Sequence, residues 1–250
     1  MDNTVTVAAI TALVTSLASK GAEGPAHTIN LLWKVTLGRW DKPLERYIER
    51  RDSDKEKYAE EILKETNKIP ADNIKLEADI SIIGPALEAS KYYIGDAVLR
   101  SMFAKLIAAS MDSRHNGEVH HAFVEIIKQM NPIDAKVLAD LKDSSHVLYC
   151  TVKRQETTDV YCDLYMSNRF PEPSAESSLA ISNLERLGLI HVSRYMQFFS
   201  AEDDIILKSL VKKFKSTNYY KELPDTDNAH FFMNEVLLTP LGVKFRNICL

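Results

Sequence analysis

Apolar residues recur with a helical period over roughly the first 141 positions of the chain. The clearest case is Val98, Met102, Phe103, Leu106 and Ile107, whose spacing of i, i+4, i+5, i+8 and i+9 places them on one face of a helix. Comparable patterns and their Gly and Pro breaks predict further helices at residues 5–18, 26–37, 43–67, 84–93, 123–130 and 133–141. Gly84-Pro85 is expected to open the fourth of these. The first half of the chain therefore predicts a helical bundle.

The character of the pattern changes after Leu141. Residues 146–153 and 157–165 are rich in β-branched and aromatic side chains around a polar turn, which predicts a β-hairpin. A further helix, acidic at its start and basic at its end, is expected over residues 201–215, as the helix dipole favours. The second half therefore mixes strands with helices.

Two separate segments of the second half suggest a known arrangement. An amphipathic helix capped by Ser174 or Ser177 ends at Gly188, where glycine permits a left-handed conformation, and an apolar strand follows at residues 190–192. A second apolar strand, Val236–Leu238, leads into Thr239-Pro240, which is expected to cap and open a last helix. Helix, strand, loop, strand and helix is the order of the rear half of a winged helix.

The length of 250 residues is enough for two modest domains. We expect a mostly α protein with a smaller α+β part, comprising a helical bundle at residues 1–131 and a winged-helix-like domain at residues 132–250. The three cysteines, Cys150, Cys162 and Cys249, form no CxxC pair and are expected to be reduced thiols of a cytoplasmic protein. Cys150 and Cys162 flank the predicted hairpin and could meet across it.

The net charge of −4 argues against a surface devoted to nucleic acid. The helix at residues 174–188 carries two Glu against one Arg, which is unfavourable for phosphate contact. Its candidate contact residues are Asn183 and Arg186, with Arg194 after the following strand. A structural or protein-contacting role of the winged-helix-like part is the favoured interpretation.

A polar cluster lies between Asp112 and Glu125. Asp112, His115, His120 and His121 are residue types that bind metals or exchange protons, but neither HxxxH nor HExxH occurs. The gap between His115 and His120 contains a glycine, so a loop is expected rather than one helical face. Loop shaping, with His120 capping the next helix, is the alternative interpretation. No GxSxG motif or glycine-rich phosphate loop is present, and we expect no catalytic residue, metal site or cofactor.

The N-terminal region offers a different kind of candidate. Trp33 and Trp40 are seven residues apart and share a helical face if the helix continues between them, which makes them candidate partner contacts. Val5–Ala18 is apolar, but it is shorter than the roughly 20 residues that a membrane span needs, and no basic residue precedes Lys20. Packing on protein is therefore expected rather than membrane binding.

Several segments, in this order along the chain, together resemble the abortive infection alpha family of bacterial proteins. They are Ile69–Ile74, Ile83–Ala89, Leu99–Leu106, Ser110–Asp112, Val119–Met130 with Asn131-Pro132, Asn183–Ile190, and Leu238–Gly242 with Phe245. One departure is His121, which stands where the family usually has proline after the histidine at His120. The resemblance implies a role in bacterial defence against phage and supplies no catalytic mechanism.

We therefore expect a phage-defence component that acts by protein contact, as a sensor or regulator, without a recognisable active site. The expected partner is a protein of phage or host origin, and formation of a homo-oligomer is left open. Two alternatives remain. One is a winged-helix DNA-binding regulator, and the other is a metal-dependent nuclease or hydrolase centred on residues 112–121.

Overall fold

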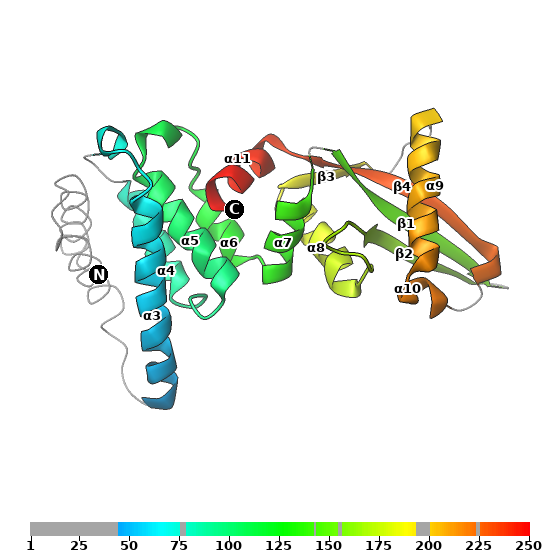
Figure 1. Cartoon of the computed structure of the whole chain (residues 1–250), viewed down its shortest axis with the longest axis horizontal. Coiled ribbons are helices and arrows are strands. Elements are labelled where there is room, and N and C mark those ends of the chain that lie inside the picture. The colour runs from blue at the N-terminus through cyan, green and yellow to red at the C-terminus, as the bar shows by residue number, and fades with distance from the viewer. Residues whose placement is uncertain (1–44, 76–78, 143, 155–156, 194–200, 224–225) are drawn as a thin grey trace. The chain divides into compact units, whose positions relative to one another are not determined.

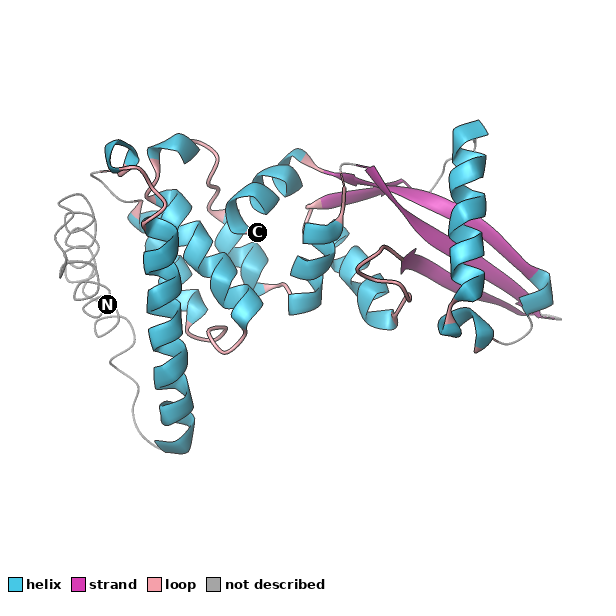
Figure 2. Cartoon of the chain, in the orientation of Figure 1, coloured by secondary structure: helices cyan, strands magenta, loops and turns pink. Residues whose placement is uncertain are grey.

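The computed structural model describes residues 45–75, 79–142, 144–154, 157–193, 201–223 and 226–250. They belong to two compact units: unit 1 comprises the described residues up to 132 together with 244–250, and unit 2 comprises those from 133 to 243. The helices expected at residues 5–18 and 26–37 lie outside the described residues. The expectation of a mostly helical protein with a smaller α+β part is confirmed, because the four strands of the described residues lie in unit 2 and the other regular elements are helices (Figure 2).

Unit 1 is built from helices. Its elements are α3 (Glu45–Thr66), the short 3-10 helix η1 (Ala71–Asn73), α4 (Ile80–Ser90), α5 (Ala97–Ser110), the 3-10 helix η2 (Ser113–His115), α6 (Ala122–Lys128) and the later residues of α11 (Pro240–Cys249). The predicted apolar face of α5 lies in the core, where Phe103 and Leu106 are fully buried. Asp96 caps this helix by accepting hydrogen bonds from the backbone N–H groups of Val98 and Leu99.

The prediction that Gly84-Pro85 opens a helix is wrong. Helix α4 begins about one turn earlier, at Ile80, because the side chain of Asp79 accepts a hydrogen bond from the backbone N–H of Ser81 and caps the helix there. Pro85 then lies inside the helix, where it removes a backbone donor. The aspartate cap, which the sequence interpretation overlooked, outweighs the proline.

Unit 2 contains one antiparallel sheet with the strand order β2-β1-β4-β3 (Figure 1). The strands are β1 (Ser144–Arg154), β2 (Thr157–Tyr165), β3 (Ile190–Ser193) and β4 (Ala229–Leu238). The predicted hairpin is confirmed as β1 and β2. A bulge shifts their register, so that Cys150 pairs with Tyr161 and Asp163 adopts a positive φ of 54°. Cys150 is buried and Cys162 is exposed, so the suggested contact between the two cysteines does not form.

The helices of unit 2 are α7 (Pro132–Asp140), α8 (Ala175–Arg186), α9 (Ala201–Ser216), α10 (Asn218–Lys221), the 3-10 helix η3 (Thr226–Asn228) and the start of α11. Ser174 and Ser177 form a reciprocal capping box at the start of α8. Helix α9 covers one face of the sheet, where Phe214 packs against Cys150, Val152 and Leu164 (Figure 1). The opposite face carries the partly exposed side chains of Tyr149, Val160 and Phe232, which we call the open sheet face.

A close backbone contact joins the start of α11 to the turn after α8. Gly188 adopts a positive φ of 71°, as expected at the end of a helix. The Thr239 hydroxyl donates to the carbonyl of Gly188 at 2.6 Å, and the Thr239 backbone N–H donates to the carbonyl of Leu189 at 3.0 Å. The same hydroxyl accepts a hydrogen bond from the backbone N–H of Gly242. Thr239 therefore caps α11 and fixes it to the strand entry, which confirms its predicted role as a helix cap.

Over the described residues, the helices are all too short or too polar to cross a membrane.

Candidate functional site

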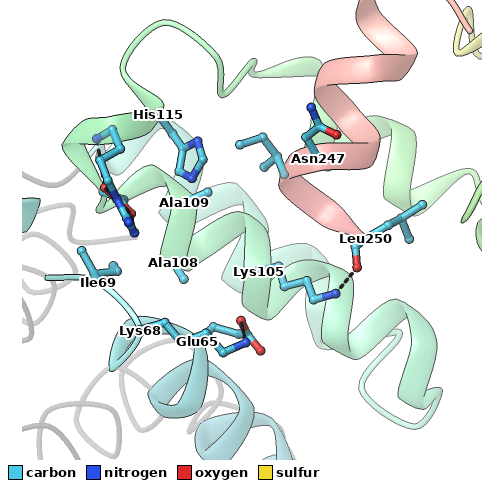
Figure 3. Close-up of a pocket in the computed structure, with 12 residues that line it drawn as sticks. Glu65, Lys68, Ile69, Lys105, Ala108, Ala109, His115, Asn247 and Leu250 are labelled. Carbon is cyan, nitrogen blue, oxygen red and sulfur yellow. Dashed lines mark hydrogen bonds and ion pairs between the residues drawn. The ribbon is translucent and has the colours of Figure 1, made fainter. Parts of the chain in front are cut away.

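Unit 1 contains a pocket of about 260 Å³ (Figure 3). The end of α3, the second half of α5, η2 and the end of α11 contribute its walls. Its lining residues are Glu65, Lys68, Ile69, Lys105, Ala108, Ala109, Asp112, Arg114, His115, Asn247, Ile248 and Leu250. It combines apolar walls with several charged groups, as small-molecule sites commonly do.

The hollow depends on small residues in α5. Ala108 and Ala109 lie one turn after Lys105, so that the three positions share one side of the helix. The alanine side chains leave space that larger apolar residues would fill. The Lys105 ammonium group donates a hydrogen bond to the main-chain oxygen of Leu250, which links α5 to the end of the chain (Figure 3).

Asp112 is the buried acidic group of the pocket wall. Its carboxylate accepts a hydrogen bond from the backbone N–H of Arg114 at 2.9 Å, and the Arg114 guanidinium donates through Nε at 2.9 and 3.0 Å and through Nη2 at 2.5 Å. Burial alone would raise the pKa of Asp112, but the hydrogen bonds and the positive charge of Arg114 lower that pKa below its ordinary value. The carboxylate of Asp112 is thus held in its ionised form, and both of its oxygens already accept hydrogen bonds from Arg114.

This arrangement predicts a specific acid sensitivity. A carboxyl group whose pKa is lower in the folded than in the unfolded state stabilises the fold above its unfolded pKa, and that stabilisation is lost as the pH falls through the folded pKa. We expect Asp112→Asn to reduce the free energy of unfolding at neutral pH, with the difference from wild type shrinking below pH 3.8, the ordinary value. Urea unfolding from neutral to acidic pH measures this difference. A gap that stays constant down to pH 3 would contradict the assignment.

The other members of the polar cluster have separate partners. His115 lines the pocket, and its Nδ1 lies 3.0 Å from Oε2 of Glu118. The Nδ1 of His120 accepts a hydrogen bond from the backbone N–H of Ala122 at the start of α6, and the Nδ1 of His121 lies 3.4 Å from the Ser81 hydroxyl. Within the ranges that the structure describes, no group of three or more His, Cys, Asp or Glu side chains is placed to hold a metal ion.

The candidate contact residues of unit 2 are bonded to one another. Asn183 donates through Nδ2 to the buried carboxylate of Asp134 at 2.7 Å. The carbonyl oxygen of the Asn183 side chain accepts from Nε and Nη2 of Arg186 at 3.0 and 2.7 Å. This chain of bonds ties α8 to α7. Trp33, Trp40 and Arg194 lie outside the described residues, so their contact roles stay predictions.

The sequence interpretation missed the open sheet face. Tyr149 and Phe232 are directly paired across β1 and β4, with ring centroids 5.8 Å apart, and Val160 lies on the same face of β2. The sequence of β1 contained part of the information needed to recognise this face. Leu148, Cys150 and Val152 point to the buried face, so Tyr149 between them must point to the other one. Recognising the face also required the pairing of β4, which lies about 80 residues further along the chain.

Comparison with known proteins decides the family. The model of the abortive infection alpha family matches residues 50–249. The chain belongs to this family. Neither the curated proteins nor the solved structures gave a match. Membership of the abortive infection alpha family confirms the resemblance and indicates a role in phage defence.

The structure explains several of the segments that carry the abortive infection alpha resemblance. In unit 1, Ile74 forms a β-bridge with Asp112, and the backbone N–H of Lys75 donates to the carbonyl of Met111. In unit 2, the Asn183–Ile190 and Leu238–Gly242 segments meet at the Thr239 hydrogen bonds. These segments therefore have a structural role in holding distant parts of the chain together.

Proposed function

We propose that this member of the abortive infection alpha family is a phage-defence component that acts by protein contact, as a sensor or regulator. The observation that carries the proposal is the open sheet face. Val160 is 51% exposed and Phe232 is 45% exposed, although both lie in regular strands of a sheet whose other face is covered by α9. The occupant that we propose for this face is a phage or host protein with an apolar surface of its own.

The physical argument rests on rigidity and burial. Aromatic side chains bury large areas, and they are enriched among residues that dominate the energy of protein interfaces. The rings of Tyr149 and Phe232 contact each other in a tilted arrangement and are held by paired strands, so they lose little conformational freedom when a partner binds. The face is thus suited to a protein partner without rearrangement.

The remaining features fit the same function. We propose that α8, β3, β4 and α11 form a winged-helix-like arrangement that contacts the partner through β4, while the role of α8 is structural. Asn183 and Arg186, the residues of α8 that could reach DNA bases, are engaged with each other and with Asp134. Asp112 is engaged by Arg114, which favours loop shaping over hydrolysis in the 112–121 segment.

Single charge substitutions on the open sheet face are expected to abolish partner capture. The full chain, carrying a tag, would be recovered from infected and uninfected cells, and bound protein, nucleic acid and metal would be measured in each eluate. Val160→Glu and Phe232→Glu should each lower recovery of the protein partner by at least tenfold, since central interface residues contribute about 2 kcal/mol or more. The same variants should lose protection against phage.

Two exposed apolar residues elsewhere provide matched controls. Leu179→Glu on α8 and Ile205→Glu on α9 introduce the same charge at positions that are 64% and 66% exposed, and both should leave capture intact. Circular dichroism would confirm that all four variants fold. Salt-sensitive nucleic acid or tightly bound metal in the wild-type eluate, without a stoichiometric protein, would refute the proposal and favour the regulator or the hydrolase.

A further inference from the structure

We propose that the pocket of unit 1 binds a small organic phosphate, of about the size of a sugar phosphate. This inference concerns a site that the proposed protein contact does not use, and its test does not depend on that contact. The argument rests on the size of the pocket, the balance of its charges and the division of its walls into polar and apolar parts.

The first step is size. The volume of about 260 Å³ lies just below the roughly 300–1,000 Å³ of pockets that take drug-sized ligands. A small metabolite therefore fits better than a dinucleotide or a peptide. The walls are built from the regular helices α3, α5 and α11 together with η2, so the hollow is formed before a ligand arrives.

The second step is charge. Lys68, Lys105, Arg114 and His115 line the pocket, against two acidic side chains, Glu65 and Asp112. Each acidic side chain is already bonded to a neighbouring cation, Glu65 to Lys68 at 2.5 Å and Asp112 to Arg114. Within each pair the opposite charges cancel, so neither acidic side chain repels an anion, and the ammonium of Lys68 and the guanidinium of Arg114 remain hydrogen-bond donors at the wall.

Lys105 and His115 complete the polar side of the site. The Lys105 ammonium donates to a main-chain oxygen of Leu250, and no side-chain carboxylate in the described part of the chain is bonded to it. His115 is half-buried, and its Nδ1 is engaged by Glu118 at 3.0 Å. Ammonium, guanidinium and imidazole groups are the usual donors to phosphate oxygens.

The third step is the apolar wall. Ile69, Ala108, Ala109 and Ile248 offer carbon surface, and the amide of Asn247 offers a neutral hydrogen-bonding group (Figure 3). An inorganic ion would use only the cationic groups. A phosphate that carries a small organic body would also use the carbon surface and the amide, so the organic phosphate is the better match.

The test is a calorimetric titration of the full chain with ribose 5-phosphate, ribose and inorganic phosphate as probes. Ribose 5-phosphate should bind, ribose should not, and inorganic phosphate should bind more weakly than the sugar phosphate. Lys105→Met and Lys68→Met should each weaken binding by about tenfold, because each removes one charge-assisted hydrogen bond. Lys68 is 59% exposed, so its replacement is not expected to unfold the protein.

Lys57→Met is the matched control. Lys57 lies in α3, which ends two residues before Lys68. It is 54% exposed and pairs with Asp54 at the same i,i+3 spacing as Lys68 with Glu65, but it does not line the pocket. Its replacement should leave the affinity for ribose 5-phosphate unchanged. The proposal is overturned if the wild type binds no sugar phosphate at millimolar concentration, if inorganic phosphate binds equally well, or if Lys57→Met weakens binding as much as Lys68→Met does.

Discussion

Replacing Gly242 by alanine is expected to destabilise unit 2 by about 3 kcal/mol or more. This cost is the sum of the free energy of overpacking and that of the hydrogen bonds that are lost. A Cβ atom at this position would lie 1.8 Å from the carbonyl oxygen of Leu189 and 2.8 Å from its carbonyl carbon. Both are backbone atoms of the turn after α8, so no side chain can move aside. The start of α11 would have to shift, and the hydrogen bonds from Thr239 to Gly188 and Leu189 would lengthen or break.

The sign of this effect is opposite to that expected from helix propensity. Alanine is normally favoured over glycine inside a helix by about 0.5–1 kcal/mol. Gly84→Ala in α4 is the natural control, because a Cβ atom there meets nothing within 4 Å, and it is expected to be stabilising by about that amount. Two glycines in helices should therefore respond in opposite directions.

Thermal unfolding followed by circular dichroism distinguishes these cases. Gly242→Ala should lower the Tm by about 10 °C, as about 3 kcal/mol implies for a chain of this size. Hydrogen exchange should show the loss of protection first in β3 and β4, whose junction with α11 is disturbed. A Tm within 2 °C of wild type would show that the turn after α8 can move, and that the close contact does not constrain the fold.

The local signals of this sequence predicted local structure well. The serine cap of α8, the left-handed Gly188, the hairpin of β1 and β2 and the cap formed by Thr239 were all predictable, because each depends on residues close together in the chain. The error at Gly84-Pro85 has the same origin. Two helix-start signals, Asp79 and Gly84-Pro85, lie within six residues of each other, and the helix begins at the first of them.

Long-range pairing was not predictable from the same signals. Only the last three residues of β4 were expected as a strand, yet β4 runs from Ala229 to Leu238 and pairs with both β1 and β3. Its partner β1 lies about 80 residues earlier in the chain, and no local pattern encodes that register. The open sheet face follows from this pairing, so it could not be recognised either.

The candidate site shows the same difference between what local sequence predicts and what depends on the tertiary fold. Asp112 and His115 were selected for their residue types, and both line the pocket. His120 and His121 were selected for the same reason, but they bond to the start of α6 and to Ser81. Lys68, Lys105 and Asn247 were not selected, because they come from the turn after α3, from α5 and from α11, which only the tertiary fold brings together.

Truncating Phe245 to alanine is the second large effect that we expect, with a loss of about 3–5 kcal/mol from the stability of unit 1. Phe245 is fully buried, and its ring meets that of Phe123 edge to face, with centroids 5.2 Å apart and an interplanar angle of 90°. This geometry is favourable for aromatic rings and adds about 0.5–1.5 kcal/mol to the burial of area. The alanine variant loses both contributions and leaves a cavity between α6 and the end of α11.

Conservative variants separate the ring contact from the burial. Phe123→Leu and Phe245→Leu keep most of the apolar volume, so each single change should cost less than alanine does. The double variant should cost less than the sum of the two single variants, by about 0.5–1.5 kcal/mol, because the ring pair is already lost in each single one. Urea unfolding, with hydrogen exchange of α5 and α6 to localise the effect to unit 1, measures these differences.

Lys244→Ala is the matched control, because Lys244 is the exposed neighbour of Phe245 on the same helix and its replacement should change stability by no more than about 0.5 kcal/mol. Additive costs for Phe123→Leu and Phe245→Leu would show that the rings contribute only area and no specific geometry. A loss below about 1 kcal/mol for Phe245→Ala would show that the end of α11 is not part of the core of unit 1. The presence of Phe123 and Phe245 in the segments that resemble the family would then need an explanation other than the contact between their rings.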